Sequence, residues 1–226
     1  MGVSTLPEMI FGDNQVTFFH EPSGLTLDFN CFDAIRGAKH KEGGEEDPVV
    51  KYAGTWKAKR EGKLTEQDQG IRWTYQTDYT GTLSYASDRV KEVQAIDTEQ
   101  GINYELLKDT SQPIKCTDMV VLYEDELHDC GVSRCYVRYR VMPNCFFILL
   151  RHWLRVDEVV SRLHDTRIFH EFGTDHLVRE LCHKELPLSK VPSCEQADIP
   201  FVKYDNPDEH QHLMKTTHMR IEKIVM

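Results

Sequence analysis

The sequence predicts an α+β fold that is built mainly from β-strands, and its 226 residues suit one large domain or two small ones. Three observations favour this class. Apolar and polar residues alternate along Ile71–Tyr79 and Ser133–Met142, with the two-residue period of a half-buried strand. The apolar segment Cys145–Val156 meets the turn Asp157-Glu158 and then the alternating segment Val159–His170, as in a β-hairpin. Helical signals are short and scattered, so few helices are expected.

The N-terminal part predicts two strands and a short helix. Val16–Phe19 and Leu25–Phe29 flank a loop that contains Pro and Gly, as hairpin strands do. Asn30–Arg36 predicts a short helix that begins at Asn30 or Asp33, because both residue types cap helix N-termini.

The chain changes character between Gly37 and Gly70. This stretch holds adjacent glycines, an acidic run that ends in proline, and a basic segment, and Trp56 is its only large apolar anchor. Such a composition predicts a long, flexible surface insertion.

The remaining elements follow in order. Glu99–Leu107 is weakly helical, and Ile114–Tyr123 and Leu177–Cys182 are rich in strand formers. After residue 187 prolines and polar residues recur, so 187–226 is expected to form a strap-like tail. Met214–Met226 is expected to dock a final strand at the end of that tail.

The segment Cys145–Val156 also permits a helix. Phe146, Leu149 and Trp153 fall on one helical stripe, but a helix would turn Phe147 and Ile148 outward. As a strand, its first half is apolar on both faces, as in a central strand. We favour the hairpin.

Charge and cysteine content restrict the function classes. The net charge of −10 disfavours nucleic acid and anionic membranes as partners. Met1–Phe11 lacks the features of a secretory signal, and the longest apolar run, Cys145–Leu150, is far too short to span a bilayer. The seven cysteines form no C-x-x-C pair, which indicates reduced thiols and a cytoplasmic or nuclear protein.

Two clusters of acidic residues and histidines are candidates for chemistry. The first is the connector Glu124–Asp129, and the second comprises His164-Asp165 and His170-Glu171. Both contain possible metal ligands, so a metal-dependent hydrolase that uses the connector with His164 and Asp165 is the alternative function. However, strand alternation places His164 and Asp165 on opposite faces, and the spacing matches no known metal motif. No metal, cofactor or catalytic residue is therefore predicted.

Arginines on neighbouring predicted strands suggest recognition instead. With Tyr139, Trp153 and Phe169 they would line a groove for an acidic, aromatic peptide or a carboxyl terminus. The alternative is that they pair with Asp157, Asp165 and Glu171 on a solvated sheet face. The arginines are Arg138, Arg140, Arg151, Arg155, Arg162 and Arg167.

Six sequence blocks in order resemble the TOR signalling pathway regulator-like (TIPRL) family. They are LPEMIFGDN (6–14), FNCFDAIRG (29–37), WTYQTDYTGTL (73–83), AIDTE (95–99), LYEDELHDCGVS (122–133) and RVMPNCFFILLRHWLRVDEVVSRLHDTRIFHE (140–171). The resemblance implies a single domain over residues 1–226 with a two-layer core of antiparallel sheets. It also implies a monomeric, non-enzymatic regulator that binds the catalytic subunit of type 2A protein phosphatases in TOR signalling. Family members carry a further segment ahead of the block that begins at Pro7 here.

The resemblance also implies site residues. Asp33, Ile96, Leu163 and Asp165 correspond to phosphatase-facing positions, and Leu163 stands where relatives are expected to carry Met. The arginine groove is expected to hold the acidic, aromatic C-terminal tail of the phosphatase. The residues expected to contact that tail are Arg140, Arg155 and Arg167.

Overall fold

The computed structural model describes residues 6–11, 13–38, 48, 50, 74–85, 93–188 and 205–226. An eight-stranded sheet runs in the order β1 (Met9–Ile10), β6 (Cys116–Asp125), β7 (Gly131–Val141), β8 (Cys145–Val156), β9 (Val160–Glu171), β10 (His176–Pro187), β11 (Lys215–Val225) and β5 (Ala95–Asp97). A three-stranded sheet consists of β2 (Gln15–His20), β3 (Leu25–Asn30) and β4 (Thr82–Tyr85). All pairings within these sheets are antiparallel, which confirms the α+β class. The described helices are α1 (Cys31–Arg36), α3 (Tyr104–Lys108), α4 (Pro207–His210) and the 3₁₀ turn η3 (Gln211–Leu213).

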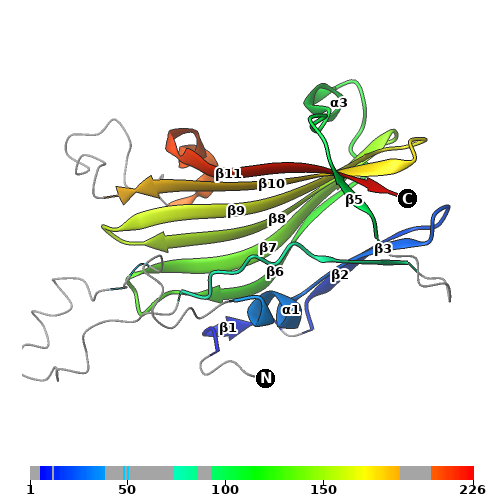
Figure 1. The fold of residues 1–226 in the computed structure, drawn as a ribbon. Coiled ribbons are helices and arrows are strands. Elements are labelled where there is room, and N and C mark those ends of the chain that lie inside the picture. The colour runs from blue at the N-terminus through cyan, green and yellow to red at the C-terminus, as the bar shows by residue number, and fades with distance from the viewer. Residues whose placement is uncertain are drawn as a thin grey trace, which may run out of the picture.

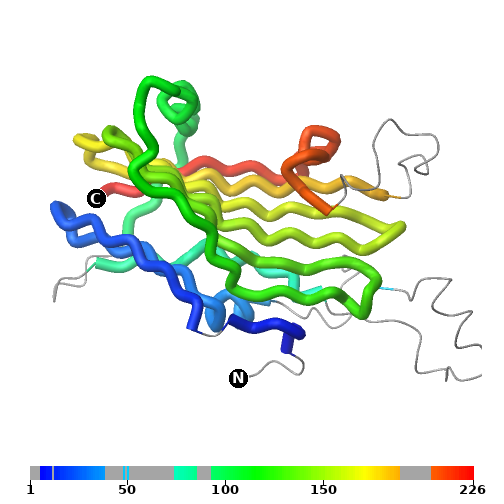
Figure 2. The backbone as a smooth tube through the Cα atoms, turned by 180° about the vertical axis from the view of Figure 1, so that it is seen from behind, coloured from blue at the N-terminus to red at the C-terminus, as the bar shows by residue number. Residues whose placement is uncertain are grey.

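The three-stranded sheet and α1 pack against one face of the large sheet, while α3 and α4 project from the other (Figures 1 and 2). The core between the two layers joins Leu27 and Phe29 of β3 to Val137, Ile148 and other apolar residues of the large sheet. We call this side of the large sheet the inner face and the opposite side the outer face. None of the described helices is long and apolar enough to cross a membrane.

The N-terminal predictions are confirmed. β2, β3 and α1 occupy the expected positions. Asn30, rather than Asp33, caps α1, because its Oδ1 accepts a hydrogen bond of 2.9 Å from the Asp33 N–H.

The β8–β9 hairpin is confirmed, and the helix over 145–156 is wrong. β8 pairs with β7 on one side and β9 on the other along its whole length. Ile148 and Leu150 fill the core between the layers, whereas Trp153 lies in a separate apolar cluster on the outer face. A strand covered on both faces has no need of alternation, which explains why its pattern also fitted a helix.

The predicted strand Ile71–Tyr79 is wrong over its described part, 74–79. Only Thr77 forms a bridge there, to Ala38. The carbonyl of Tyr75 instead accepts a hydrogen bond of 2.6 Å from the Tyr123 hydroxyl, and that of Thr74 accepts one of 2.6 Å from Ser133 Oγ. Thr74 and Tyr75 are therefore buried in a connection that crosses the sheet, and side chains of the sheet form hydrogen bonds with its carbonyl groups.

The predicted tail needs partial correction, whereas the flexible insertion stays a prediction. Most of 37–70 lies outside the described residues, but Val50 is buried in a cluster with Leu127 and Leu154. The tail 187–226 does not remain a strap throughout, because 207–213 are helical and β11 joins the large sheet beside β10. The expected final strand within 214–226 is thus confirmed.

A buried histidine predicts acid sensitivity. His170 Nδ1 lies 2.9 Å from the carbonyl oxygen of His176, so Nδ1 carries the ring proton, and Nε2 has no hydrogen-bond partner among the described residues. Burial, assisted by the charge of His20, lowers the pKa of His170 below its ordinary value. As the pH falls, the unfolded chain therefore takes up a second proton on this ring before the folded chain does. The neutral ring contributes to stability above a pH of about 6.5, the pKa in the unfolded state, and this contribution is lost as the pH falls through the lower pKa of the folded state.

We expect the free energy of unfolding to fall between pH 7.5 and 5 in denaturant titrations. His170→Gln should reduce the slope of that dependence by up to about 1.4 kcal/mol per pH unit. The slope, unlike the absolute stability, is insensitive to any packing lost in the variant. Identical slopes for both proteins would contradict the prediction.

Candidate functional site

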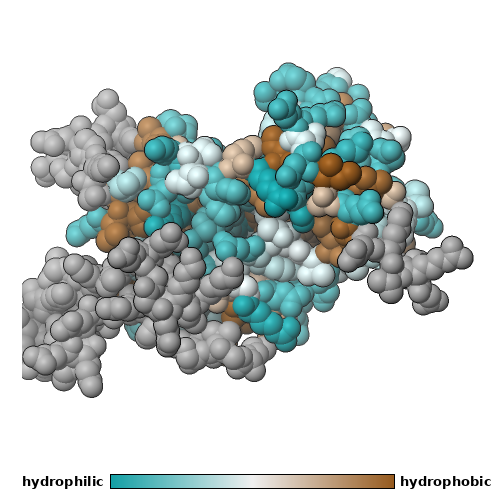
Figure 3. All heavy atoms as spheres, in the orientation of Figure 1, coloured by the Kyte–Doolittle hydropathy of each residue, from teal (hydrophilic) through white to brown (hydrophobic). Residues whose placement is uncertain are grey.

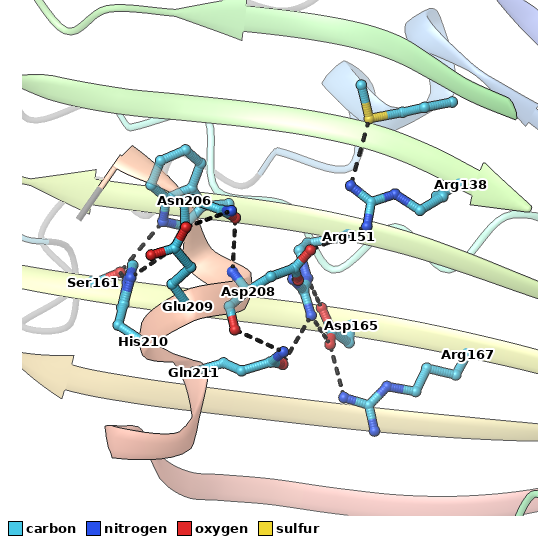
Figure 4. Close-up of polar contacts among 12 residues, drawn as sticks. Arg138, Arg151, Ser161, Asp165, Arg167, Asn206, Asp208, Glu209, His210 and Gln211 are labelled. Carbon is cyan, nitrogen blue, oxygen red and sulfur yellow. Dashed lines mark hydrogen bonds and ion pairs between the residues drawn. The ribbon is translucent and has the colours of Figure 1, made fainter. Parts of the chain in front are cut away.

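The outer face carries a buried ion pair at its centre. Arg151 on β8 stands directly opposite Asp165 on β9. Arg151 Nε and Nη2 donate to the two Asp165 carboxylate oxygens at 2.6 and 2.8 Å, and both residues are only 2% exposed. Two parallel hydrogen bonds between buried charges fix both side chains in one geometry (Figure 4).

This pair extends toward α3 through a second arginine. Arg167 Nη2 donates to Asp165 Oδ2 at 2.9 Å, and its Nη1 lies 3.8 Å from a Glu180 carboxylate oxygen. Glu180 also accepts hydrogen bonds from the Tyr104 hydroxyl at 2.8 Å and the Ile102 N–H at 2.9 Å. One network of charged side chains and their hydrogen bonds therefore connects β8, β9 and β10 with α3 on the outer face.

In the other direction the pair holds the C-terminal hook, which we define as residues 205–214. Asn206 caps α4, and Asp208 in its first turn lies between two arginines (Figure 4). Its carboxylate accepts from Arg151 Nη1 at 2.6 Å and from Arg138 Nη1 at 3.0 Å. Asp205 pairs with Arg155 at the start of the hook.

The hook is also anchored by burial. His210 is fully buried, donates from Nδ1 to the Asn206 carbonyl at 3.0 Å, and accepts from Ser161 Oγ at 3.2 Å through Nε2. Met214 packs with Leu163 and Trp153. The hook is therefore held on the outer face by both packing and hydrogen bonds.

The electrostatics keep this network ionised. Burial alone would raise the pKa of Asp208, but the charges of Arg151 and Arg138 outweigh it and hold that pKa below its ordinary value. Burial likewise opposes the charge of Arg151, yet the hydrogen bonds and charge of Asp165 raise its pKa. Neither group changes protonation near neutral pH. We call the set Arg138, Arg151, Asp165, Arg167, Glu180 and Asp208 the outer-face network.

Comparison with known proteins identifies the family. The profile of the TIP41-like family matches residues 9–192. This chain belongs to the TIP41-like family. The resemblance expected from the six sequence blocks is thereby confirmed.

Named relatives of this TIP41-like chain span distant eukaryotes. The human TIP41-like protein is 37% identical over 223 residues, covering 98% of this chain and 77% of its own length. The Arabidopsis thaliana TIP41-like protein is 38% identical over 201 residues, covering 80% of this chain and 66% of its own length. The Saccharomyces cerevisiae relative, 32% identical over 198 residues and matched over 78% of this chain and 52% of its own length, is named type 2A phosphatase activator TIP41.

The structure separates the seven residues predicted to contact a partner. Asp165, Arg155 and Arg167 lie in or beside the outer-face network, and Leu163 lies in the apolar cluster below the hook. Leu163 and Asp165 are 0% and 2% exposed, so both lie beneath the outer surface, and their contact with a partner stays a prediction.

Of the other three predicted residues, Arg140 and Ile96 are exposed and Asp33 is half-buried. Arg140, on β7, borders a shallow pocket of about 570 Å³ that is also lined by Lys108, Ile114 and Met142. Asp33 lies on α1, beyond the inner face, and Ile96, 54% exposed, lies on the edge strand β5. Figure 3 shows apolar residues open to solvent in the region of β5. Asp33 and Ile96 do not join the arginines in one site.

The aromatic lining predicted for an arginine groove is wrong. Tyr139 packs against the core between the layers, and Trp153 and Phe169 are 2% and 4% exposed. Arg162 points to the inner face and pairs with Glu185 at 2.6 Å. Pairing with acids is confirmed for Asp157 and Asp165, which bind Arg155 and the Arg151–Arg167 pair, respectively.

Sequence reasoning missed the acids that complete the network. Glu180 lay in a predicted strand with no visible partner, and Asp208 lay in the predicted tail. A signal for the hook existed, because Asn206-Pro207-Asp208-Glu209 combines a capping residue, proline and an acidic first turn, the pattern of a helix start.

The residues of the hydrolase alternative do not assemble. His164 and Asp165 point to opposite faces, as alternation predicts, and both Asp165 oxygens are held by arginines. In the acidic connector, Glu124 pairs with Arg134, and Asp125 accepts hydrogen bonds from the backbone N–H groups of Glu8 and Leu127. These carboxylates hold the fold together in this arrangement.

Proposed function

We propose that this TIP41-like chain is a non-enzymatic regulator that binds the catalytic subunit of a type 2A protein phosphatase, in the cytoplasm and within TOR signalling. The observation that carries the proposal is the outer face, where a fixed charge network supports exposed arginines and apolar side chains. The name of the yeast relative, a type 2A phosphatase activator, supports the choice of partner.

The exposed residues of the outer face have the composition of a protein interface. Arg138 and Arg140 are exposed on β7, and Met119, opposite Arg138 on β6, is 45% exposed. Tyr104 on α3 and Leu213 in the hook are 38% and 40% exposed. Met, Tyr and Arg are enriched in the energetically important parts of interfaces, which favours protein binding over catalysis here.

The network below these residues favours binding without rearrangement. Arg151 and Asp165 are buried and doubly hydrogen-bonded, and they position the hook through Asp208. A surface fixed before association loses less conformational entropy when a partner binds. Arginines at its rim suit an acidic partner segment, such as the phosphatase C-terminal tail.

The proposal is tested by measuring the affinity of the full chain for a purified type 2A catalytic subunit. We expect stoichiometric binding, and we expect Met119→Asp with Arg140→Glu to raise the Kd at least about tenfold, a loss of about 1.4 kcal/mol or more. Both side chains are exposed, so the fold should be retained. Ile96→Asp and Asp33→Arg test whether the interface extends to β5 and α1.

The matched control is Glu21→Lys, which changes an exposed charge in the turn between β2 and β3. Its Kd should equal that of the unaltered chain. Absence of binding by the unaltered chain would overturn the function. Equal binding by the outer-face variant would reject the outer face as the interface.

A further inference from the structure

A row of histidines crosses the inner face of four neighbouring strands. His152, His164, His183 and His218 lie on β8, β9, β10 and β11, and each stands directly opposite the next in the strand register. Successive ring centroids are 6.1, 3.9 and 5.2 Å apart. The row lies on the opposite face of the sheet from the outer-face network and belongs to no part of the proposed interface.

An aspartate reaches the centre of this row from the connection that crosses the sheet. Asp78 Oδ1 lies 3.7 Å from His164 Nδ1. One ligand atom each from Asp78, His164 and His183 all fall within 4.8 Å of one another. Ligand atoms around a tetrahedral zinc ion are about 3.4 Å apart, given bond lengths near 2.1 Å. Small side-chain rotations would therefore bring the three atoms to coordination distance.

We propose that Asp78, His164 and His183 form a binding site for a divalent transition-metal ion of the zinc class. Two imidazoles and one carboxylate suit Zn²⁺ and its neighbours, whereas Mg²⁺ and Ca²⁺ prefer oxygen ligands throughout. Asp78 is 59% exposed at its side chain, so an ion can enter from solvent. The ring of His218, which is exposed, lies 5.2 Å from that of His183 beside the three ligands.

Packing holds the two imidazoles face to face. The rings of His164 and His183 are stacked at 10°, an arrangement that opposes two positive charges. The Gln76 amide donates from Nε2 to His164 Nε2 at 3.1 Å, so His164 Nδ1 carries the ring proton, faces Asp78 and lies 3.3 Å from the Thr77 carbonyl oxygen. A metal ion bound at Nδ1 would take the place of that proton.

A metal ion here would fasten the crossing connection to the sheet. Residues 74–79 have no strand pairing beyond the bridge at Thr77. Tyr123 and Ser133 hold their start, and Gln76 and Thr77 contact His164 of β9. Coordination would add a link from Asp78 to β9 and β10. Binding to the folded chain alone raises its stability by mass action, so zinc should raise the Tm.

The experiment titrates Co²⁺ into the full chain, free of metal and affinity tag and kept reduced. We expect one Co²⁺ per chain, with visible absorption from nitrogen and oxygen ligation and without the intense near-ultraviolet bands of thiolate ligation. Asp78→Asn and His183→Gln should each raise the Kd at least about tenfold, since even residues that only orient ligands have effects of that size.

His212→Gln is the matched control, because His212 is exposed and lies in η3. It should retain the affinity and the increase in Tm with Zn²⁺ that both ligand variants lose. Asp78→Asn replaces an exposed side chain, so its fold is retained even if His183→Gln unfolds. Substoichiometric binding, thiolate bands or unchanged affinity in Asp78→Asn would overturn the site, whatever the outcome of the phosphatase measurement.

Discussion

Asp165→Ala is expected to lower the free energy of unfolding by about 3–5 kcal/mol, the cost of leaving a buried charge without its partner. Arg151, at 2% exposure, would lose its buried counter-ion and keep Asp208, Gln211 and Tyr136 beside its guanidinium. Arg167 would lose its 2.9 Å hydrogen bond to Asp165. Denaturant unfolding monitored by tryptophan fluorescence measures this loss.

The companion variant replaces both charges. Arg151→Met with Asp165→Leu removes the pair without stranding either member, so it should be markedly more stable than Asp165→Ala. A double variant as unstable as the single one would show that the ion pair is not the cause.

The same variants distinguish a supporting role of Asp165 from direct contact between Asp165 and the phosphatase. Because Asp165 is buried, its replacement should weaken binding only by releasing the hook, which Asp208 fastens to Arg151. Proteolysis within 205–214 should therefore accelerate in Asp165→Ala. Weaker binding with an unchanged hook would instead indicate direct contact and would restore Asp165 as a partner-facing residue.

Leu163→Ala is expected to cost about 2–5 kcal/mol, because the cavity it leaves adds to the lost transfer free energy. Leu163 is completely buried and packs with Val132, Trp153 and Met214 at the base of the hook. Thermal and denaturant unfolding of the full chain measure the effect.

Leu163→Met is the control for this prediction. It conserves volume and should cost less than about 1.5 kcal/mol. It also matches the residue expected at this position in relatives. A loss below about 1 kcal/mol for Leu163→Ala would show that the cluster collapses around the missing side chain.

Much of the fold was predictable from local pattern. The two-residue period over 133–142 and the turn at Asp157-Glu158 gave β7, β8 and β9 within a few residues of their ends. The connection at 74–79 misled the prediction, because Thr74 and Tyr75 have strand-forming side chains but place their carbonyls against Ser133 and Tyr123. Residue type alone does not distinguish these two ways of satisfying a buried backbone.

The candidate site was predictable only in part. The arginines of β7, β8 and β9 were visible as a group, and Asp165 was visible as a possible partner. Glu180 and Asp208 were not, since nothing in their local sequence indicates which strand or side chain they face. The exposure of Arg140 followed from alternation, but the burial of Leu163 depended on the hook that covers it.

By itself the sequence determined the long strands of the large sheet, which residues share a face of each of these strands, and the family to which the chain belongs. The tertiary structure alone decided which charges meet. Arg151 binds Asp165 14 residues away and Asp208 57 residues away, and the histidine row needs four strands in register. Alternation is a property of neighbouring residues along one strand, whereas register is fixed by packing between strands and across both sheet faces.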